Sequence, residues 1–353
     1  MFPRGRAILS PRHGRVNTIR RAMPTAFVTG GTGFVGAHLA RALATEGWTV
    51  RLLARRPDAV RAGLLEGVPV VPVPGDLSPE GVPAAALAGV DAIVHVAGLT
   101  KARSLEAYRE VNARGTERLL AAASAAAPEA LFVHVSSQAA AGPSRGGVPV
   151  TECDAPRPIS WYGVSKREGE QAVQRLWRGP WHVVRPGVVY GPGDRGLLQY
   201  FRMAARGIVP VPAGRARVQV IGAERAALAL ARAAARRDLG GRTSFLCDPM
   251  PVRLEELARM IGALPERRPR FFAVPDAGVR ALGALETGLE LITRRSRPFN
   301  ADKARELLAG DWLCDGQPLS RLLDLPEPVP LAAGLRAAWD WYRAAGWLPG
   351  KPL

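Results

Sequence analysis

Residues 25–36 read Thr-Ala-Phe-Val-Thr-Gly-Gly-Thr-Gly-Phe-Val-Gly, a short apolar run that leads into a glycine-rich turn. The apolar run, residues 25–29, predicts a short buried strand. The spacing of apolar residues from 34 to 46 predicts a helix that begins directly after the turn. The stretch is therefore a strand–turn–helix unit with glycines at positions 30, 33 and 36.

Small residues at this spacing have a specific use. They allow a tight turn, close packing of the helix on the sheet, and the approach of a pyrophosphate to the backbone. The amino terminus of the helix adds N–H donors and the positive end of a dipole. The turn predicts a dinucleotide site, and the alternative is a glycine-rich turn that binds no ligand.

Strands and helices alternate along the first half of the chain. This alternation indicates βαβ units, and right-handed crossovers then build a doubly wound parallel sheet. The predicted fold class is α/β of the Rossmann type, with ligands at the carboxyl ends of the strands. Further strands are predicted at 49–53, 68–73, 91–96, 131–136 and 181–184, and helices at 83–87, 105–127 and 168–177.

Beyond residue 190 the pattern becomes irregular and rich in Pro and Gly. We expect a nucleotide-binding domain over 24–190 and a smaller, mostly helical substrate-binding region over 191–353, within which strands of the first sheet can return. The aromatic residues Trp339, Trp341 and Tyr342 are expected to pack a helical cap. Helical segments are predicted at 225–235, 254–261, 278–292 and 334–345.

Composition argues against several functions. The chain has 353 residues and a net charge of +17, but 44 of its 48 basic residues are arginine. Outside the N-terminus it has no basic run with interleaved aromatics, so nucleic-acid binding is not expected. The three cysteines, Cys153, Cys247 and Cys314, lack CxxC spacing, which predicts neither a metal site nor a disulfide framework and favours a reducing cytoplasm.

Residues 1–22 contain six arginines and no acidic residue. They have three interpretations: a targeting segment, a basic tail, or an upstream start with Met23 as the true beginning. The third is favoured, since a strand follows Met23 directly. The chain contains no uninterrupted apolar stretch of about 18 residues, so a transmembrane helix is not predicted. The nearest approach, residues 271–292, would suit an apolar substrate or peripheral contact with a membrane.

The end of the second strand bears on the choice of cofactor. An acidic residue usually stands about 20 residues after the glycine turn in NAD-preferring sites, where it binds the ribose 2′-hydroxyl. Here the position is Arg55, beside Arg56. Because a guanidinium can pair with a 2′-phosphate, NADP(H) is predicted as the preferred cofactor and NAD(H) as the alternative. Asp76-Leu77 is placed to contact the adenine, and residues 96–98 to pass under the ribose and pyrophosphate, although either could be an ordinary strand-end turn.

Tyr162 and Lys166 carry the catalytic prediction. A spacing of four places both side chains on one helix face, where the ammonium would lower the tyrosine pKa towards working pH. The alternative is a surface pair. Ser137, with Ser136 before it, ends the fifth strand and could bind a substrate carbonyl. Asn112 is unfavourable within a helix unless its amide holds a backbone carbonyl or a relay water.

Together these motifs resemble the extended short-chain dehydrogenase/reductase superfamily, that is, the NAD-dependent epimerase/dehydratase family. The similarity covers residues 25–350. It implies that Tyr162 is the acid/base, that Lys166 tunes its pKa and binds ribose, that Ser137 polarises the carbonyl, and that Asn112 joins the proton relay. It implies a cofactor site made of Gly30, Thr32, Gly33, Phe34, Val35, Gly36, Arg55, Asp76, Leu77, Val96, Ala97, Gly98, Tyr162, Lys166, Pro186 and Val189.

Two departures from the family pattern bear on the branch. Nucleotide-sugar enzymes commonly carry Asn where this chain has Val188, and an Asp-Asp pair where it has Glu224-Arg225. Residues 50–57 resemble instead the dihydroflavonol-4-reductase and 3β-hydroxysteroid dehydrogenase-like branch. The leading hypothesis is an NADP(H)-preferring oxidoreductase acting on a ketone or secondary alcohol of a hydrophobic or ring-bearing small molecule.

Two alternatives stay open. One is a nucleotide-sugar epimerase or dehydratase that uses the same Ser-Tyr-Lys site. The other is a non-catalytic cofactor-sensing or scaffold protein. The resemblance also implies a homodimer.

Overall fold

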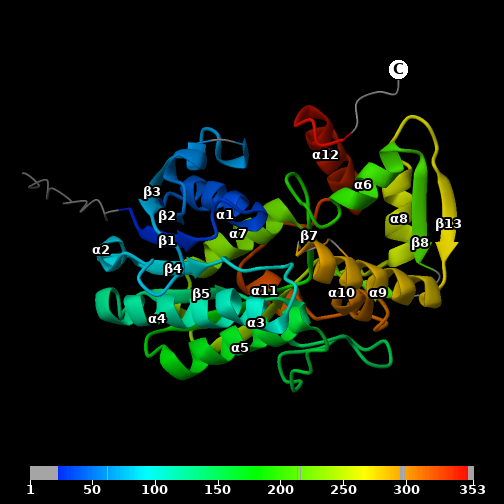
Figure 1. Ribbon diagram of the computed structural model, residues 1–353. Coiled ribbons are helices and arrows are strands. Elements are labelled where there is room, and N and C mark those ends of the chain that lie inside the picture. Colours follow the sequence, from blue (N-terminus) through cyan, green and yellow to red (C-terminus); the bar gives the residue numbers. More distant parts are fainter. Residues whose placement is uncertain are drawn as a thin grey trace, which may run out of the picture.

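A seven-stranded sheet forms the centre of the molecule (Figure 1). The computed structural model describes residues 23–348 apart from positions 62, 213, 215, 295, 296 and 298, so the interpretations of residues 1–22 lie outside the described residues. The strand order is β11-β6-β5-β4-β1-β2-β3, and every neighbouring pair is parallel. The strands are β1 (Thr25–Thr29), β2 (Thr49–Ala54), β3 (Val70–Pro74), β4 (Ala92–His95), β5 (Leu131–Val135), β6 (Trp181–Pro186) and β11 (Arg242–Leu246).

Helices cover both faces of this sheet (Figure 1). On one face α1 (Phe34–Thr45) packs against α7 (Ala223–Ala234). On the other lie α2 (Ala84–Leu87), α4 (Gly115–Ala126) and α5 (Trp161–Leu176). Because both faces are covered, β4 and β5 bury every residue, and apart from His95 and His134 all their residues are apolar instead of alternating with polar ones. The predicted doubly wound Rossmann sheet is confirmed.

The strand order reverses at β1, with β2 and β3 on one side and β4, β5 and β6 on the other. Ligands of doubly wound sheets bind in the crevice at such a switch point, beyond the carboxyl ends of the strands. The glycine turn follows β1 and residues 96–98 follow β4, so both segments predicted to contact the cofactor meet at this crevice.

The chain beyond residue 190 contributes to the sheet and also builds a second lobe. β11 pairs with β6, and α7 covers the sheet. The lobe contains short two-stranded sheets: β7 (Val188–Tyr190) with β10 (Val220–Gly222), β8 (Ile208–Pro212) with β13 (Arg270–Val274), and β9 (Arg217–Val218) with β12 (Val252–Arg253). Its other helices are α6 (Leu198–Ala205), α8 (Leu254–Gly262), α9 (Asp276–Thr293), α10 (Ala301–Leu307), α11 (Gln317–Leu322) and α12 (Leu331–Ala344).

The second lobe has its own hydrophobic core. Trp339 and Tyr342 of α12 are buried there against Phe201, and the Tyr342 hydroxyl donates to the Asp194 carbonyl at 2.6 Å. The expectation that these aromatics pack a helical cap is confirmed.

None of the described helices is long and apolar enough to cross a membrane. Short 3-10 turns lie at Pro57–Arg61, Gly63–Leu65, Gln138–Ala140 and Arg237–Leu239.

Candidate active site

The glycine turn packs directly against its neighbours. Gly30 has φ +70°, and a Cβ there would lie 2.5 Å from the Ala97 backbone nitrogen. A Cβ on Gly36 would lie 2.2 Å from the Gly30 carbonyl oxygen, so α1 can approach the turn only without a side chain at that position. Gly33 precedes α1 and provides no side-chain cap for the first amides of the helix. An uncapped helix terminus beside open backbone fits a pyrophosphate.

The segment after β4 joins the cofactor side of the site to the catalytic side. The Ala97 amide donates to the Thr29 hydroxyl at 3.3 Å, which ties this segment to β1. A Cβ on Gly98 would lie 3.0 Å from Asn112 Oδ1 and 3.7 Å from Lys166 Nζ. Gly98 therefore leaves open the space next to the two predicted catalytic side chains.

Arg55 stands immediately after β2 with an exposed side chain. It lies close enough to Asp76 to affect that carboxyl group: hydrogen bonds from Ser78 lower the Asp76 pKa, and the charge of Arg55 lowers it further. The carboxylate of Asp76 accepts the Ser78 amide at 2.8 Å within its own turn. The neighbouring Leu77 packs against Gly115 of α4. The structure thus brings the predicted adenine and 2′-phosphate contacts to one end of the sheet.

Helix α5 carries both Tyr162 and Lys166. It begins at Trp161, seven residues before the predicted helical segment, because Ser160 caps it by accepting the Gly163 amide at 3.0 Å. The Lys166 ammonium is buried and donates to the Val135 carbonyl, at the end of β5, at 2.7 Å. Ser137, which follows the same strand, lies close enough to the Tyr162 hydroxyl to lower its pKa.

Burial determines the protonation of this pair. It raises the pKa of Tyr162 to about 12, although the hydrogen bond with Ser137 acts in the opposite direction. It lowers the pKa of Lys166 to about 8, although the charge of Glu170 opposes this shift. For the chain by itself the expectation that Lys166 brings the tyrosine pKa towards working pH is wrong, because desolvation raises that pKa and it is Ser137, not Lys166, that opposes the rise. At neutral pH the phenol is protonated and the lysine is mainly charged.

Two buried histidines lie near Lys166 without adding charge. Burial, followed by the charge of Lys166, lowers the pKa of His95 to about 3 and that of His134 well below its ordinary value. His95 is held between the hydroxyls of Thr29 at 2.6 Å and Thr116 at 2.9 Å. Both histidines are therefore neutral at physiological pH.

Asn112 connects the segment after β4 with α5. Its amide accepts the Leu99 amide proton at 2.7 Å and donates to the Leu99 carbonyl at 3.0 Å and to the Ser165 hydroxyl at 2.9 Å. The single helix predicted over 105–127 is in fact α3 (Leu105–Arg109), a π-helical turn (Glu110–Arg114) and then α4. The π turn contains Asn112, and such turns are frequent at functional sites.

A buried ion pair lies one turn beyond Lys166. Glu170 is fully buried and binds the Arg185 guanidinium through both oxygens, each at 2.7 Å. Its carboxylate also accepts the Ser136 hydroxyl at 2.6 Å and Arg167 at 2.8 Å. Ser136 is thereby held in the core, whereas the Ser137 hydroxyl accepts the Ala139 amide at 3.1 Å. The sequence analysis did not identify this pair, and the only local signal was the four-residue spacing from Lys166 to Glu170.

Helix α10 supplies two further carboxylates that the sequence analysis missed. Asp302 accepts the Trp161 amide with its two oxygens at 2.9 and 3.0 Å, and Glu306 accepts the Ser160 hydroxyl at 2.6 Å. Both are buried against the first turn of α5, next to Tyr162, and the charge of Glu306 adds to the rise in the Tyr162 pKa. No local pattern could have revealed contacts between segments 141 and 146 residues apart.

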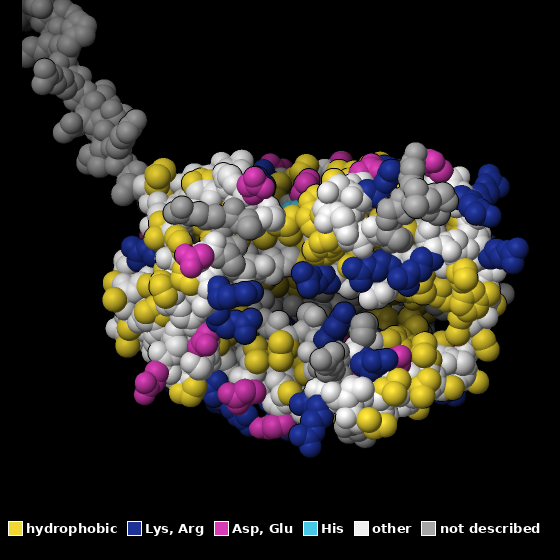
Figure 2. Space-filling model, turned by 45° about the horizontal axis from the view of Figure 1, so that its top comes forward, with side chains coloured by type: hydrophobic (Ala, Val, Ile, Leu, Met, Phe, Trp, Pro, Cys, Tyr) yellow, Lys and Arg dark blue, Asp and Glu magenta, His cyan; other side chains and the backbone are white. Residues whose placement is uncertain are grey.

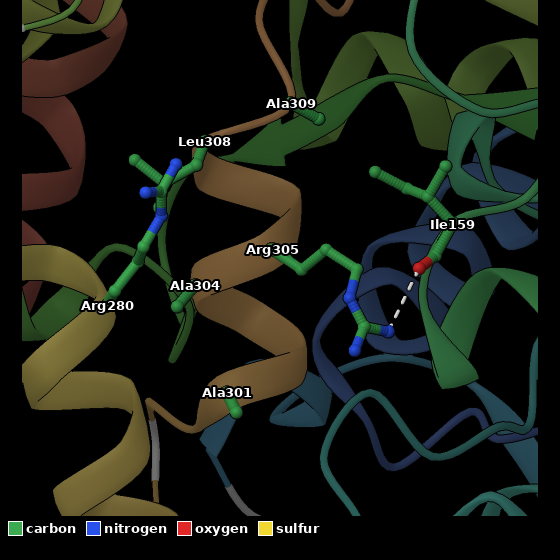
Figure 3. A pocket seen from close by; sticks show the side chains of 7 residues that line it. All are labelled: Ile159, Arg280, Ala301, Ala304, Arg305, Leu308 and Ala309. Carbon is green, nitrogen blue, oxygen red and sulfur yellow. Dashed lines mark hydrogen bonds between the residues drawn. The ribbon is translucent and has the colours of Figure 1, made fainter. Parts of the chain in front are cut away.

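An open groove of about 490 Å³ runs beside the start of α5. Figure 3 shows α10 in the middle of the groove, with Arg280 on α9 to one side and Ile159 to the other. Arg305 crosses towards Ile159 and donates to its carbonyl at 3.3 Å. The lining therefore combines aliphatic side chains with two guanidinium groups. The remaining lining residues are Ala301, Ala304, Leu308 and Ala309.

Pro186 and Val189, predicted to line the nicotinamide, lie at the end of β6 and on β7. Pro186 is buried, Val189 is half-buried, and Val188 between them is 38% exposed. Asn, which is common at position 188 in nucleotide-sugar enzymes, is thus replaced by an exposed apolar side chain. No group of His, Cys, Asp and Glu that could hold a metal ion occurs among the residues described.

The family follows from comparison with known proteins. The model of the NAD dependent epimerase/dehydratase family matches residues 26–243, more than half of the chain. The chain belongs to this family. The predicted resemblance to the extended short-chain dehydrogenase/reductase superfamily is thereby confirmed, and the family and relatives are NAD-dependent reductases, dehydrogenases or epimerases. The chain is an enzyme of this class.

The relatives include named reductases, and the solved structures include complexes with UDP-sugars and NAD. A ceramide reductase of Caulobacter vibrioides is 37% identical over 328 residues, 91% of this chain and 95% of the relative. A 4-hydroxy-2-methyl-3-oxo-4-farnesyl-3,4-dihydroquinoline-1-oxide ketoreductase of Stigmatella aurantiaca is 32% identical over 67% of this chain and 71% of its own. MoeE5 in complex with UDP-glucose and NAD is 23% identical, with a TM-score of 0.72 over 91% of this chain and 99% of its own, and shows the fold alone.

Proposed function

We propose that the chain is an NADP(H)-preferring oxidoreductase that interconverts a ketone and a secondary alcohol on a lipid-like substrate. One observation carries this proposal: the half-buried Tyr162, whose pKa is affected by the nearby Ser137 hydroxyl, stands one helical turn from the buried Lys166, which donates to the Val135 carbonyl at the carboxyl end of the sheet. A proton donor (Tyr162), a hydroxyl (Ser137) and an ammonium (Lys166) are the side-chain groups needed to reduce a carbonyl.

Each residue has a distinct role. Tyr162 donates its proton to the carbonyl oxygen, and a pKa of about 12 keeps that proton in place until the oxygen becomes basic. Ser137 donates a hydrogen bond to the same oxygen as charge develops. Lys166 stabilises the phenolate that remains, and the neutral His95 and His134 leave it without a competing cation beside it. The bound cofactor supplies the hydride.

Asn112 acts as a positioning residue. Its amide fixes the Leu99 backbone, and through Ser165 it also touches α5. Loss of the amide would remove both hydrogen bonds to the half-exposed Leu99 backbone, each worth about 0.5–1.5 kcal/mol.

Arg55 supports the preference for NADP(H). It is exposed after β2, where NAD-preferring sites carry an acidic residue, and Arg56 follows it. A guanidinium binds a phosphate in a forked, charge-assisted arrangement that a ribose hydroxyl cannot offer.

The substrate class rests on two features. The groove at the start of α5 combines aliphatic side chains with the guanidinium groups of Arg280 and Arg305, and Val188 offers no hydrogen bond to a sugar nucleotide. The ceramide reductase and the farnesyl-quinoline-oxide ketoreductase are named for substrates that join a polar, reducible centre to long hydrocarbon. A ketone with these two parts is the substrate class we propose.

The test follows absorbance of NADPH, with NADH in parallel, on detergent-dispersed long-chain ketones and on UDP-sugars. Net consumption with a long-chain ketone, faster with NADPH, is the expected result. Tyr162→Phe should lower turnover by several orders of magnitude and leave NADPH binding nearly intact, which fluorescence titration measures. UDP-sugar conversion without net consumption would instead establish epimerase chemistry. Cofactor binding without turnover on either substrate class would favour a sensing or scaffold role.

A further inference from the structure

Helix α9 exposes an apolar face on the second lobe. Leu282, Leu285, Leu289 and Ile292 recur at spacings of three and four, which places them on one side of the helix. Leu285 is 61% exposed and Ile292 is 80% exposed. Large apolar side chains that are exposed together on one helix face generally mark an interaction site.

The opposite face of α9 explains why these residues stay exposed. Gly283 packs so closely on α10 that a Cβ would lie 2.8 Å from the Ala304 methyl group. Thr287 accepts the Ala301 amide at 2.9 Å, and the buried Glu290 accepts the Arg297 amide at 2.6 Å. These contacts fix the rotation of α9, so its leucine face is turned away from the lobe.

Strand β13 extends the apolar surface. Phe272 is 48% exposed, and Ile208 of the paired strand β8, on the same face of this pair, is 52% exposed, whereas Phe271 faces α8, where Arg259 lies 5.3 Å from its ring. Figure 2 shows hydrophobic side chains gathered on the right-hand side of the molecule, where Figure 1 places β8, β13 and α9. We name these two side chains, together with the four on α9, the α9–β13 surface: Ile208, Phe272, Leu282, Leu285, Leu289 and Ile292.

Exposed arginines accompany this surface. Arg267, Arg268 and Arg270 lie directly before or within β13, and Arg206 precedes β8. Glu266 and Asp276 are the exposed acidic residues in the same stretch of chain, 263–281. Basic residues therefore outnumber acidic ones beside the apolar side chains.

We propose that the α9–β13 surface docks on a lipid bilayer that contains anionic lipids. Amphipathic surfaces with arginine beside leucine and phenylalanine bind at the headgroup boundary by burying the apolar face and attracting anionic lipid. The charge argues against a second copy of the chain as the occupant, because a symmetric dimer would bring like-charged arginines together.

The membrane docking proposed here depends on the proposed function in one respect only: a lipid-like substrate would enter the protein from this side. Flotation of the full chain with vesicles tests it. Phosphatidylcholine vesicles with and without phosphatidylglycerol are compared at low and high salt. We expect binding that requires phosphatidylglycerol and weakens with salt. The chain's residues 1–22, which carry six arginines, are present in every variant and contribute equally.

Two double variants separate the apolar and charged contributions. Leu285→Asp with Ile292→Asp should weaken vesicle binding about tenfold or more, since two exposed apolar side chains can no longer be buried in the bilayer. Arg267→Glu with Arg268→Glu should weaken it at least about fivefold for each arginine removed. All four positions are exposed, so circular dichroism should report an unchanged fold.

Val71→Asp and Arg178→Glu are the matched controls. Val71 is 52% exposed on the edge strand β3, and Arg178 is exposed just before β6 begins at the opposite end of the sheet. Both should bind as the unaltered chain does. Equal binding by all variants, or no binding to anionic vesicles, would overturn the proposal. So would a dimer in sedimentation velocity that Leu285→Asp with Ile292→Asp dissociates.

The failure of this inference is distinguishable from the failure of the proposed function. Turnover of a detergent-dispersed ketone does not depend on vesicles. Loss of flotation with intact turnover rejects only the surface, whereas flotation without turnover on any ketone rejects only the reductase.

Discussion

Replacing Asp302 tests whether α10 holds the catalytic tyrosine in place. The side chain of Asp302 is 6% exposed and accepts the Trp161 amide, directly before Tyr162, with both oxygens. Burial nevertheless raises its pKa, so the desolvation of the carboxylate outweighs the hydrogen bonds to it. Asp302→Asn removes that desolvation and keeps one acceptor oxygen, whereas Asp302→Ala leaves the Trp161 amide without an acceptor.

The two substitutions should therefore differ. We expect Asp302→Ala to destabilise the chain by about 1–3 kcal/mol, the cost of a buried polar group left unsatisfied. This corresponds to a fall in melting temperature of roughly 2–8 °C. Asp302→Asn should change stability by less than about 1 kcal/mol, because an Asn side chain is also a good cap for a helix amino terminus.

Turnover gives the second readout. A shift of about 1 Å in a reacting group can cost about a hundredfold in rate. We therefore expect Asp302→Ala to lower kcat at least about tenfold while the KM for NADPH changes little. Asp238→Ala is the control, since Asp238 is exposed and pairs only with Arg236 among the described residues. The reasoning fails if Asp302→Ala matches the unaltered chain in both readouts, or if Asp302→Asn is as damaging as Asp302→Ala.

Three further predictions concern charge in the site. Lys166, with a pKa of about 8, is charged below that pH. The kcat/KM for ketone reduction should therefore be level in mildly acidic and neutral buffer and fall above about pH 8. A level profile up to pH 10 would contradict this. Arg55→Asp should raise the KM for NADPH about tenfold or more and lower that for NADH, and equal KM values before and after would remove Arg55 from the cofactor site. Glu170→Gln leaves Arg185 buried without its counter-charge. It should lower the free energy of unfolding, measured in urea, by about 3–5 kcal/mol. A loss below about 1 kcal/mol would show that the pair is not a stabilising contact.

Local patterns in the sequence were sufficient for the fold. The apolar runs of β1, β4 and β5 and the glycines at 30, 33 and 36 predict buried strands and a helix that starts against a turn. These features depend on a residue and its near neighbours, since backbone freedom and apolar periodicity are local properties. The four-residue spacing of Tyr162 and Lys166 is local for the same reason, and α5 does carry both side chains.

The pKa values of Tyr162 and Lys166, in contrast, are determined only by the tertiary structure. The pKa of Tyr162 rises and that of Lys166 falls because several elements shield the first partly and the second almost completely from water, and no nearest-neighbour pattern encodes that burial. Likewise, the carboxylates of α10 reach the start of α5 across 141 and 146 residues of sequence. The exposure of the α9–β13 surface is also tertiary, because the packing of α9 on α10 selects which side of an apolar helix faces out. A sequence specifies which side chains are available, but the dielectric around a charge and the partner of a helix face are set only when distant segments pack together.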